Sequence, residues 1–196
     1  MNYVRILSVA AIGAIALMAF AASSASATTL KSGGVTITEI EASLTGSAKL
    51  TETGGTVLDT CTVGGISGKT NADTAIELKG VDVVSWGAKG AGCTQTTDTL
   101  NNGTFGITWI AGTNSGTVKS YGAEVTVEVG GIFSCVYGTS ATGTTLGTLV
   151  GSEVGNATLS INVSVQFKSG PPFCPQSTVW MAEYKVTKPA TLTVVE

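Results

Sequence analysis

The sequence contains one long run in which apolar and polar residues alternate without a break: Leu159-Ser160-Ile161-Asn162-Val163-Ser164-Val165-Gln166-Phe167. Alternation with a period of two, carried by β-branched residues, is typical of an antiparallel strand with one face on a core and the other in water. Patterns with a helical period are nearly absent from the mature part of the chain. The run therefore indicates an all-β protein.

Shorter runs of the same kind lie on both sides of this one. The segment 123–129 places three valines on one face and Glu124 and Glu128 on the other. Gly-Gly and Asn-Gly pairs between the runs supply the positive φ angles of tight hairpins. Roughly a dozen short strands at regular spacing predict an antiparallel β-sandwich, Ig-like or jelly-roll-like. The further strands are expected at Val35–Thr38, Ala48–Thr53, Thr56–Val63, Ala75–Val84, Thr104–Ile110, Gly116–Lys119, Gly131–Tyr137, Thr144–Val150, Val179–Val186 and Ala190–Val195.

Residues 1–27 have the three parts of a secretory signal peptide. Arg5 supplies the positive charge, Ile6–Phe20 is almost wholly apolar, and small residues end in Ala25-Ser26-Ala27. The apolar part is shorter than the ~20 residues that a membrane-spanning helix needs. We expect cleavage before Thr28, a single mature domain of residues 28–196, no stable membrane span, and a secreted location with some association with the cell surface. An uncleaved N-terminal anchor is the alternative.

The residue composition excludes several kinds of chemistry. The chain has no histidine, and its single arginine, Arg5, leaves with the signal peptide. Histidine is the commonest general base and metal ligand, and arginine is the usual bidentate group for phosphates and carboxylates. The nine mature lysines are scattered over a chain with a net charge of −3, whereas nucleic-acid binding needs a clustered basic face. We therefore expect a protein that is not an enzyme, has no cofactor or metal, and binds no nucleic acid.

The remaining polar groups offer only weak sites. Glu39 and Glu41 would turn inward if the strand from Val35 continued, but an interruption near Thr38 would keep them in water. We expect Ser67-Gly68-Lys69 to lie in a loop rather than to form a Ser–Lys catalytic pair. Calcium is the most plausible metal, although no calcium-binding loop motif is present, and its candidate ligands are Asp59, Asp73, Asp82 and Asp98.

Four cysteines, Cys61, Cys93, Cys135 and Cys174, lie tens of residues apart. An even number of cysteines in an exported chain predicts two disulfides. The alternative is a zinc site with four thiolates, but such a site usually has its ligands in close sequence pairs.

The two halves of the mature chain, roughly 35–110 and 120–196, show signs of an internal repeat. A Gly-Gly pair precedes the first cysteine of each half, and an aromatic residue precedes the second one: Trp86 stands seven residues before Cys93, and Phe167 seven before Cys174. If the repeat is real, the pairing is Cys61–Cys93 and Cys135–Cys174. Chance similarity in a chain rich in Thr and Gly is the alternative.

Three tryptophans, Trp86, Trp109 and Trp180, are the candidate ligand contacts. Exposed aromatic side chains on a β-sandwich would suit a sugar. Each of them lies in or beside an apolar run, so core packing is the competing interpretation.

Several short segments, Asp59-Thr60-Cys61-Thr62, Gly68-Lys69-Thr70, Cys93-Thr94 and Leu146-Gly147-Thr148-Leu149, resemble a group of uncharacterised secreted, Thr/Gly-rich all-β proteins from actinobacteria. The resemblance implies export and a disulfide-bonded all-β fold in a bacterial protein, and it assigns no activity.

Together these observations predict a secreted, non-enzymatic extracellular or cell-surface protein with a structural or adhesive role. Its expected partners are a cell-wall glycan or further copies of itself through edge strands. The first alternative is a carbohydrate-binding module, and the second is a small β-barrel pore of an outer envelope.

Overall fold

The structure is a computed structural model of the 196-residue chain. It describes residues 28–70, 81–86, 92–95, 97–101 and 103–196, and for residues 70, 81–86 and 97–100 it describes the backbone only. The predicted signal peptide, residues 1–27, lies outside the described residues.

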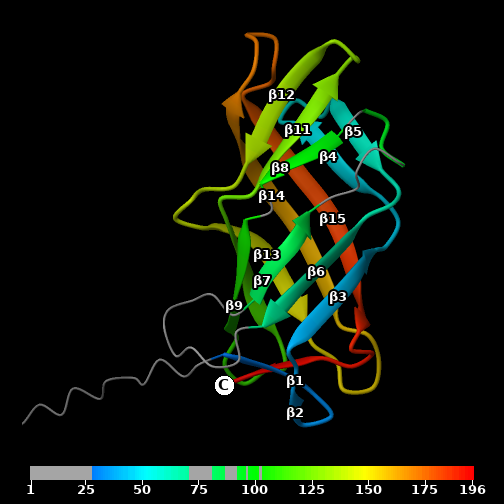
Figure 1. Ribbon diagram of the computed structural model, residues 1–196, viewed down its shortest axis with the longest axis vertical. Helices are drawn as coiled ribbons and strands as arrows, with labels where there is room; N and C mark the ends of the chain where they lie inside the picture. The colour runs from blue at the N-terminus through cyan, green and yellow to red at the C-terminus, as the bar shows by residue number, and fades with distance from the viewer. Residues whose placement is uncertain (1–27, 71–80, 87–91, 96, 102) are drawn as a thin grey trace, which may run out of the picture.

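The described part of the chain contains strands and no helix, which confirms the all-β prediction (Figure 1). No helix in these residues is long and apolar enough to cross a membrane. The strands are β1 (Thr29–Ser32), β2 (Val35–Thr36), β3 (Glu39–Leu44), β4 (Ala48–Glu52), β5 (Val57–Cys61), β6 (Gly65–Thr70), β7 (Val81–Trp86), β8 (Thr97–Asn101), β9 (Thr104–Trp109), β10 (Gly116–Tyr121), β11 (Glu124–Val129), β12 (Phe133–Gly138), β13 (Thr144–Val150), β14 (Thr158–Ser169), β15 (Ser177–Lys188) and β16 (Thr193–Val195).

Every pairing between the described strands is antiparallel. The larger sheet has the order β5-β4-β15-β3-β6-β7-β9-β10-β13-β14-β12-β11-β8, and β14 and β15 also pair with each other. These two are the longest strands among the described residues, and their pairing runs from Thr158 opposite Lys185 to Gln166 opposite Ser177. The alternating run from which the fold was predicted therefore lies in one strand of a long hairpin, whose loop is at the upper end of the molecule (Figure 1).

Side-chain alternation along this hairpin builds two hydrophobic cores. The lower core combines both halves of the chain and includes Ile40, Ile66, Ile107, Leu159 and Val186. The upper core is smaller and consists of Leu50, Val127, Cys135, Tyr137 and Cys174. Val165 and Trp180 pack against both clusters, so the hairpin connects the two cores physically.

A smaller sheet with the order β16-β1-β2 lies at the lower end of the molecule (Figure 1). Strand β1 pairs with β16, with Thr29 opposite Val195. Leu30 and Val194 are buried in the lower core. The first and last described strands are therefore neighbours, and each contributes a side chain to the core.

The strand that starts at Val35 is interrupted near Thr38, as predicted. Strand β2 ends at Thr36 and β3 starts at Glu39, where Ile40 and Ala42 are buried and Glu39 and Glu41 are exposed. The interruption changes which alternate residues face the core, so both carboxylates stay in water.

One loop prediction is wrong. Ser67, Gly68 and Lys69 lie in β6, which pairs with β3 on one side and β7 on the other. The segment lacks the β-branched residues of a typical strand, but its backbone amides and carbonyls are bonded on both sides. Strands β1, β3, β6 and β8 were not among those predicted. Only residues 81–84 of the strand expected at Ala75–Val84 lie within the described residues, as part of β7.

The structure confirms both predicted disulfides, Cys61–Cys93 and Cys135–Cys174. Each closes a loop within one half of the chain, as the repeat hypothesis requires. The repeat itself stays a prediction.

Candidate ligand pocket

The candidate site is an apolar pocket beside the upper core. Strands β4 and β5 form one wall, β11 and β12 form another, and β14 and β15 contribute Val165, Trp180 and Tyr184. Its cavity volume is about 90 Å³. Val63, which is 61% exposed, lies at the rim.

The sequence forms this pocket through strand alternation. Leu50 of β4 and Val127 of β11 point inward and are buried, while Val125 is partly buried against the upper core. The inward-facing side chains of β15 include Trp180 and Tyr184, because residues two apart on a strand share a face. The lining is therefore mostly aliphatic and aromatic, with few polar groups.

Tyr137 is the most unusual residue of the lining. Its side chain is fully buried, and its hydroxyl has no hydrogen-bond partner among the described residues. Its ring meets Phe167 edge to face, with 6.2 Å between the ring centroids. Burial raises the pKa of the Tyr137 hydroxyl to about 12, with a smaller contribution from the negative charge of Glu52. A buried hydroxyl normally has a partner, so this residue of the pocket lining keeps a hydrogen-bonding group that no described residue uses.

Trp180 and Tyr184 form the aromatic side of the pocket. Their ring centroids lie 6.4 Å apart in an edge-to-face arrangement. Tyr184 is 4% exposed, and burial raises its pKa above the ordinary value of tyrosine. Both tyrosines are therefore neutral at physiological pH and can donate or accept a hydrogen bond.

Asp59 is the one buried carboxylate in the described lining of the pocket, and its hydrogen bonds compensate for the water that it loses on burial. Its Oδ1 accepts hydrogen bonds from the Thr60 amide at 2.7 Å, the Thr94 hydroxyl at 2.8 Å and the Gln95 amide at 2.9 Å. It therefore fastens the segment that follows Cys93 to β5. The Cys61–Cys93 disulfide holds the same two segments together, so Asp59 has a structural role.

The calcium hypothesis finds no support at Asp59. The neighbouring ligand-type atoms belong to Cys61 and Cys93, whose sulfurs are bonded to each other and are not thiolates. Asp73 lies outside the described residues, and the side chains of Asp82 and Asp98 are not described.

The structure separates two of the three candidate tryptophans. Trp180 lines the pocket, whereas Trp109 ends β9, where its Nε1 donates a hydrogen bond to the Thr113 carbonyl at 2.6 Å. Trp109 packs against the lower core and is not part of the described pocket lining. The backbone of Trp86 lies in β7 opposite Ile66, and its side chain lies outside the described residues.

The two pairs of glutamates, Glu39 with Glu41 and Glu124 with Glu128, lie in different places. Glu39 and Glu41 both pair with Lys188 on the outer surface, at 3.2 and 3.4 Å, and about half of each carboxylate side chain is exposed. The hydrogen bonds that the Lys188 ammonium donates to Glu39 and, with a smaller effect, to Glu41 raise the pKa of Lys188. Glu124 lines the pocket, and Glu128 lies further along β11.

Comparisons with models of known protein families, with characterised proteins and with solved structures find no match for this chain.

Proposed function

We propose that this protein is a secreted, non-enzymatic binding protein that holds a small apolar molecule with one hydrogen-bonding group. The observation that carries the proposal is that Tyr137, whose hydroxyl has no partner among the described residues, belongs to the lining of an apolar pocket. Apolar walls with a few polar groups that orient the ligand are the usual composition of small-molecule sites.

The cavity volume limits the ligand. A volume of about 90 Å³ is smaller than the ~150 Å³ cavity that accepts benzene in an engineered protein. The pocket therefore suits the end of an alkyl chain better than a ring, with the rest of the molecule leaving past Val63 at the rim. An alcohol, ester or amide group near the chain end would bond Tyr137.

The two disulfides support an oxidising, extracellular location for this role, because disulfides persist outside the cytosol. The missing histidine supports a role in binding rather than catalysis, since the pocket has no residue with an ordinary pKa near 7.

The proposal can be tested with 1-octanol as the probe. Trp180 lines the pocket, so binding should change its fluorescence, and a Trp180→Phe variant identifies the signal. Ala48, which is 8% exposed, lines the pocket, and Ala48→Leu should fill it and weaken binding at least ~10-fold. Ala42→Leu is the matched control, because Ala42 is equally buried but lies beside the lower core cavity.

Tyr137→Phe tests the polar contact. One hydrogen bond contributes about 1 kcal/mol, so this variant should bind 1-octanol roughly fivefold more weakly and bind octane unchanged. The proposal is overturned if 1-octanol does not bind, or if Ala48→Leu and Ala42→Leu bind it equally well.

A structural or adhesive role is the second candidate, and the exposed hydrophobic side chains at the upper end of the molecule favour it. A cell-wall glycan has less support, because the described lining of the pocket is mostly apolar and Trp109 and Trp180 do not share a surface. A pore would need a polar lumen, and the interior of the lower core is filled by apolar side chains.

A further inference from the structure

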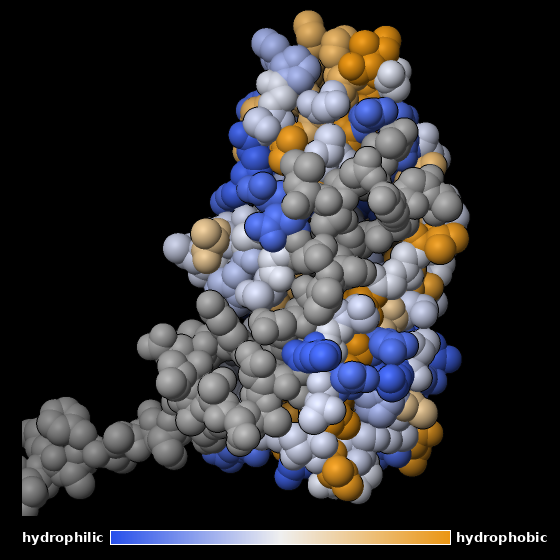
Figure 2. Space-filling view, in the orientation of Figure 1, coloured by the Kyte–Doolittle hydropathy of each residue, from blue (hydrophilic) through white to orange (hydrophobic). Residues whose placement is uncertain are grey.

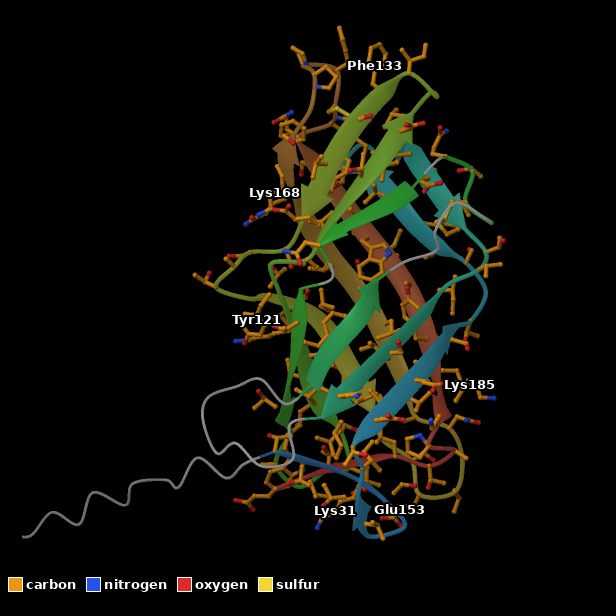
Figure 3. The ribbon with its side chains drawn as sticks, viewed as in Figure 1. Lys31, Tyr121, Phe133, Glu153, Lys168 and Lys185 are labelled. Atoms are coloured by element: carbon orange, nitrogen blue, oxygen red, sulfur yellow. A yellow bond between two sulfur atoms is a disulfide. The ribbon has the colours of Figure 1, made fainter. Side chains whose placement is uncertain are left out.

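The upper end of the molecule carries an exposed group of hydrophobic side chains, Ile132, Phe133 and Phe173, which we name the apolar tip. Their exposed fractions are 78%, 37% and 70%. Figure 2 shows hydrophobic side chains gathered at this end, where Figure 3 places Phe133. Ile132 and Phe133 come from the β11–β12 turn, and Phe173 comes from the β14–β15 loop.

The two loops of the apolar tip are held together. The Phe133 and Phe173 rings have centroids 5.0 Å apart. The Cys135–Cys174 disulfide joins the same two segments next to the rings. Gly170 approaches the β12 backbone so closely that a Cβ there would lie 3.0 Å from the Ser134 carbonyl oxygen and 2.7 Å from the Cys174 Sγ. The exposed rings therefore stand on a cross-linked base.

The apolar tip contains no charge. No charged residue occurs in the sequence from Val129 to Ser152 or from Ser169 to Ala182. The nearest charged positions along the chain are Glu128 and Lys168, and Figure 3 shows Lys168 below the tip. A surface of this kind can leave water without removing an ionic group from solvent.

The area of the apolar tip favours one kind of partner. A fully exposed aromatic side chain presents ~200 Å², so the exposed fractions of the three side chains correspond to roughly 350 Å² in total. A stable specific protein interface needs ~800 Å² from each partner. The tip is too small for such an interface, but a lipid surface requires only that apolar side chains enter the boundary between headgroups and acyl chains.

We propose that the apolar tip inserts into the surface of a lipid bilayer and attaches the protein there reversibly. The driving force is burial of Ile132, Phe133 and Phe173. The chain has a net charge of −3 and an uncharged tip, so anionic headgroups do not attract it. This surface is separate from the pocket, and the proposal does not depend on the pocket's ligand.

Co-sedimentation of the purified, oxidised protein with phosphatidylcholine vesicles tests the proposal. We expect binding that is unchanged between 50 mM and 500 mM salt and is not increased by adding phosphatidylserine. The double variant Phe133→Ser, Phe173→Ser should lower the partition coefficient at least ~10-fold, because both rings leave the bilayer. Phe173→Trp should keep the binding and add a blue shift of the fluorescence emission.

Val154→Ser is the matched control, because Val154 is 98% exposed and lies in the loop between β13 and β14. It should bind vesicles like the unchanged protein, and thermal unfolding should show that all variants are folded. Absence of vesicle binding would overturn the proposal, as would equal losses in the control and the double variant. Concentration-dependent dimers that the double variant abolishes, without vesicle binding, would assign the tip to a second copy instead.

Discussion

Tyr137 and Phe167 pack edge to face with their ring centroids 6.2 Å apart, yet the buried Tyr137 hydroxyl has no partner among the described residues. The tyrosine ring contributes to the upper core, while its oxygen makes no hydrogen bond to the described residues. Stability measurements can therefore separate the two parts of this side chain.

Replacing Tyr137 by Phe should leave the free energy of unfolding unchanged or raise it by about 1 kcal/mol. The substitution keeps the ring and removes a buried polar group whose lost hydration is not replaced. Urea denaturation measures the difference. A loss of more than 1 kcal/mol would mean that the hydroxyl has a bonding partner in the protein.

Two buried threonines provide a matched test of the same principle. Thr178 has an unpartnered hydroxyl, whereas the Thr139 hydroxyl accepts a hydrogen bond from the Ala123 amide at 3.0 Å and lies 3.1 Å from the Ser120 hydroxyl. Thr139→Val should cost about 2 kcal/mol, because the Ala123 amide would lose its partner. Thr178→Val should be neutral or stabilising. Equal effects of the two substitutions in denaturation experiments would contradict the assignment.

The two disulfides should open at different rates. Cys135 and Cys174 are 1% and 2% exposed, whereas Cys61 and Cys93 are partly exposed. A gradual increase in reductant should therefore open Cys61–Cys93 first, since exchange requires access to the sulfur. Alkylation and mass mapping at each step measure the order. Each disulfide should contribute about 4 kcal/mol in the chain-entropy model, and simultaneous opening of both would contradict the predicted order.

Alkaline pH should destabilise the protein through Tyr137. Its pKa is raised from 10.0 to about 12 in the folded state, so its contribution is fully present below pH 10 and is lost as pH rises towards 12. Between pH 9 and pH 11, the free energy of unfolding of Tyr137→Phe should therefore fall less than that of the unchanged protein. The difference between the two falls should be at most about 1 kcal/mol. Lys188 and Tyr184 also have raised pKa values but are unchanged in this variant. Identical pH dependence in both proteins would contradict the assignment.

The alternation of residues predicted much of the fold because it depends on local chemistry. The run from Leu159 to Phe167 lies within β14, and Thr144–Val150 coincides with β13. Strand β6 was missed because its Gly-Ile-Ser-Gly-Lys-Thr segment has the composition of a loop and is a strand through its two neighbours, β3 and β7. Tertiary pairing can override propensity in this way.

The residues of the pocket were harder to predict from the sequence than the strands were. Trp180 was proposed as a ligand contact and lines the pocket, but nothing in the sequence shows that Tyr137 lies among the same side chains. Their proximity depends on the pairing of β12 and β15 with opposite edges of β14. Asp59 carried a detectable signal, because a carboxylate in a strand beside Cys61 requires partners. Two of the groups that bond it, the Thr94 hydroxyl and the Gln95 amide, lie beyond Cys93 and could not be assigned to it from the sequence.

The pairing of Thr29 with Val195 gives the molecule a mechanical property. Strands β1 and β16 are antiparallel neighbours and share three residue pairs. Tension applied to the two ends of the described chain would therefore load these pairs one after another, as in opening a zipper, instead of shearing them together. The small sheet would yield at low force, whereas the Cys61–Cys93 and Cys135–Cys174 links would limit how far the rest of the chain extends.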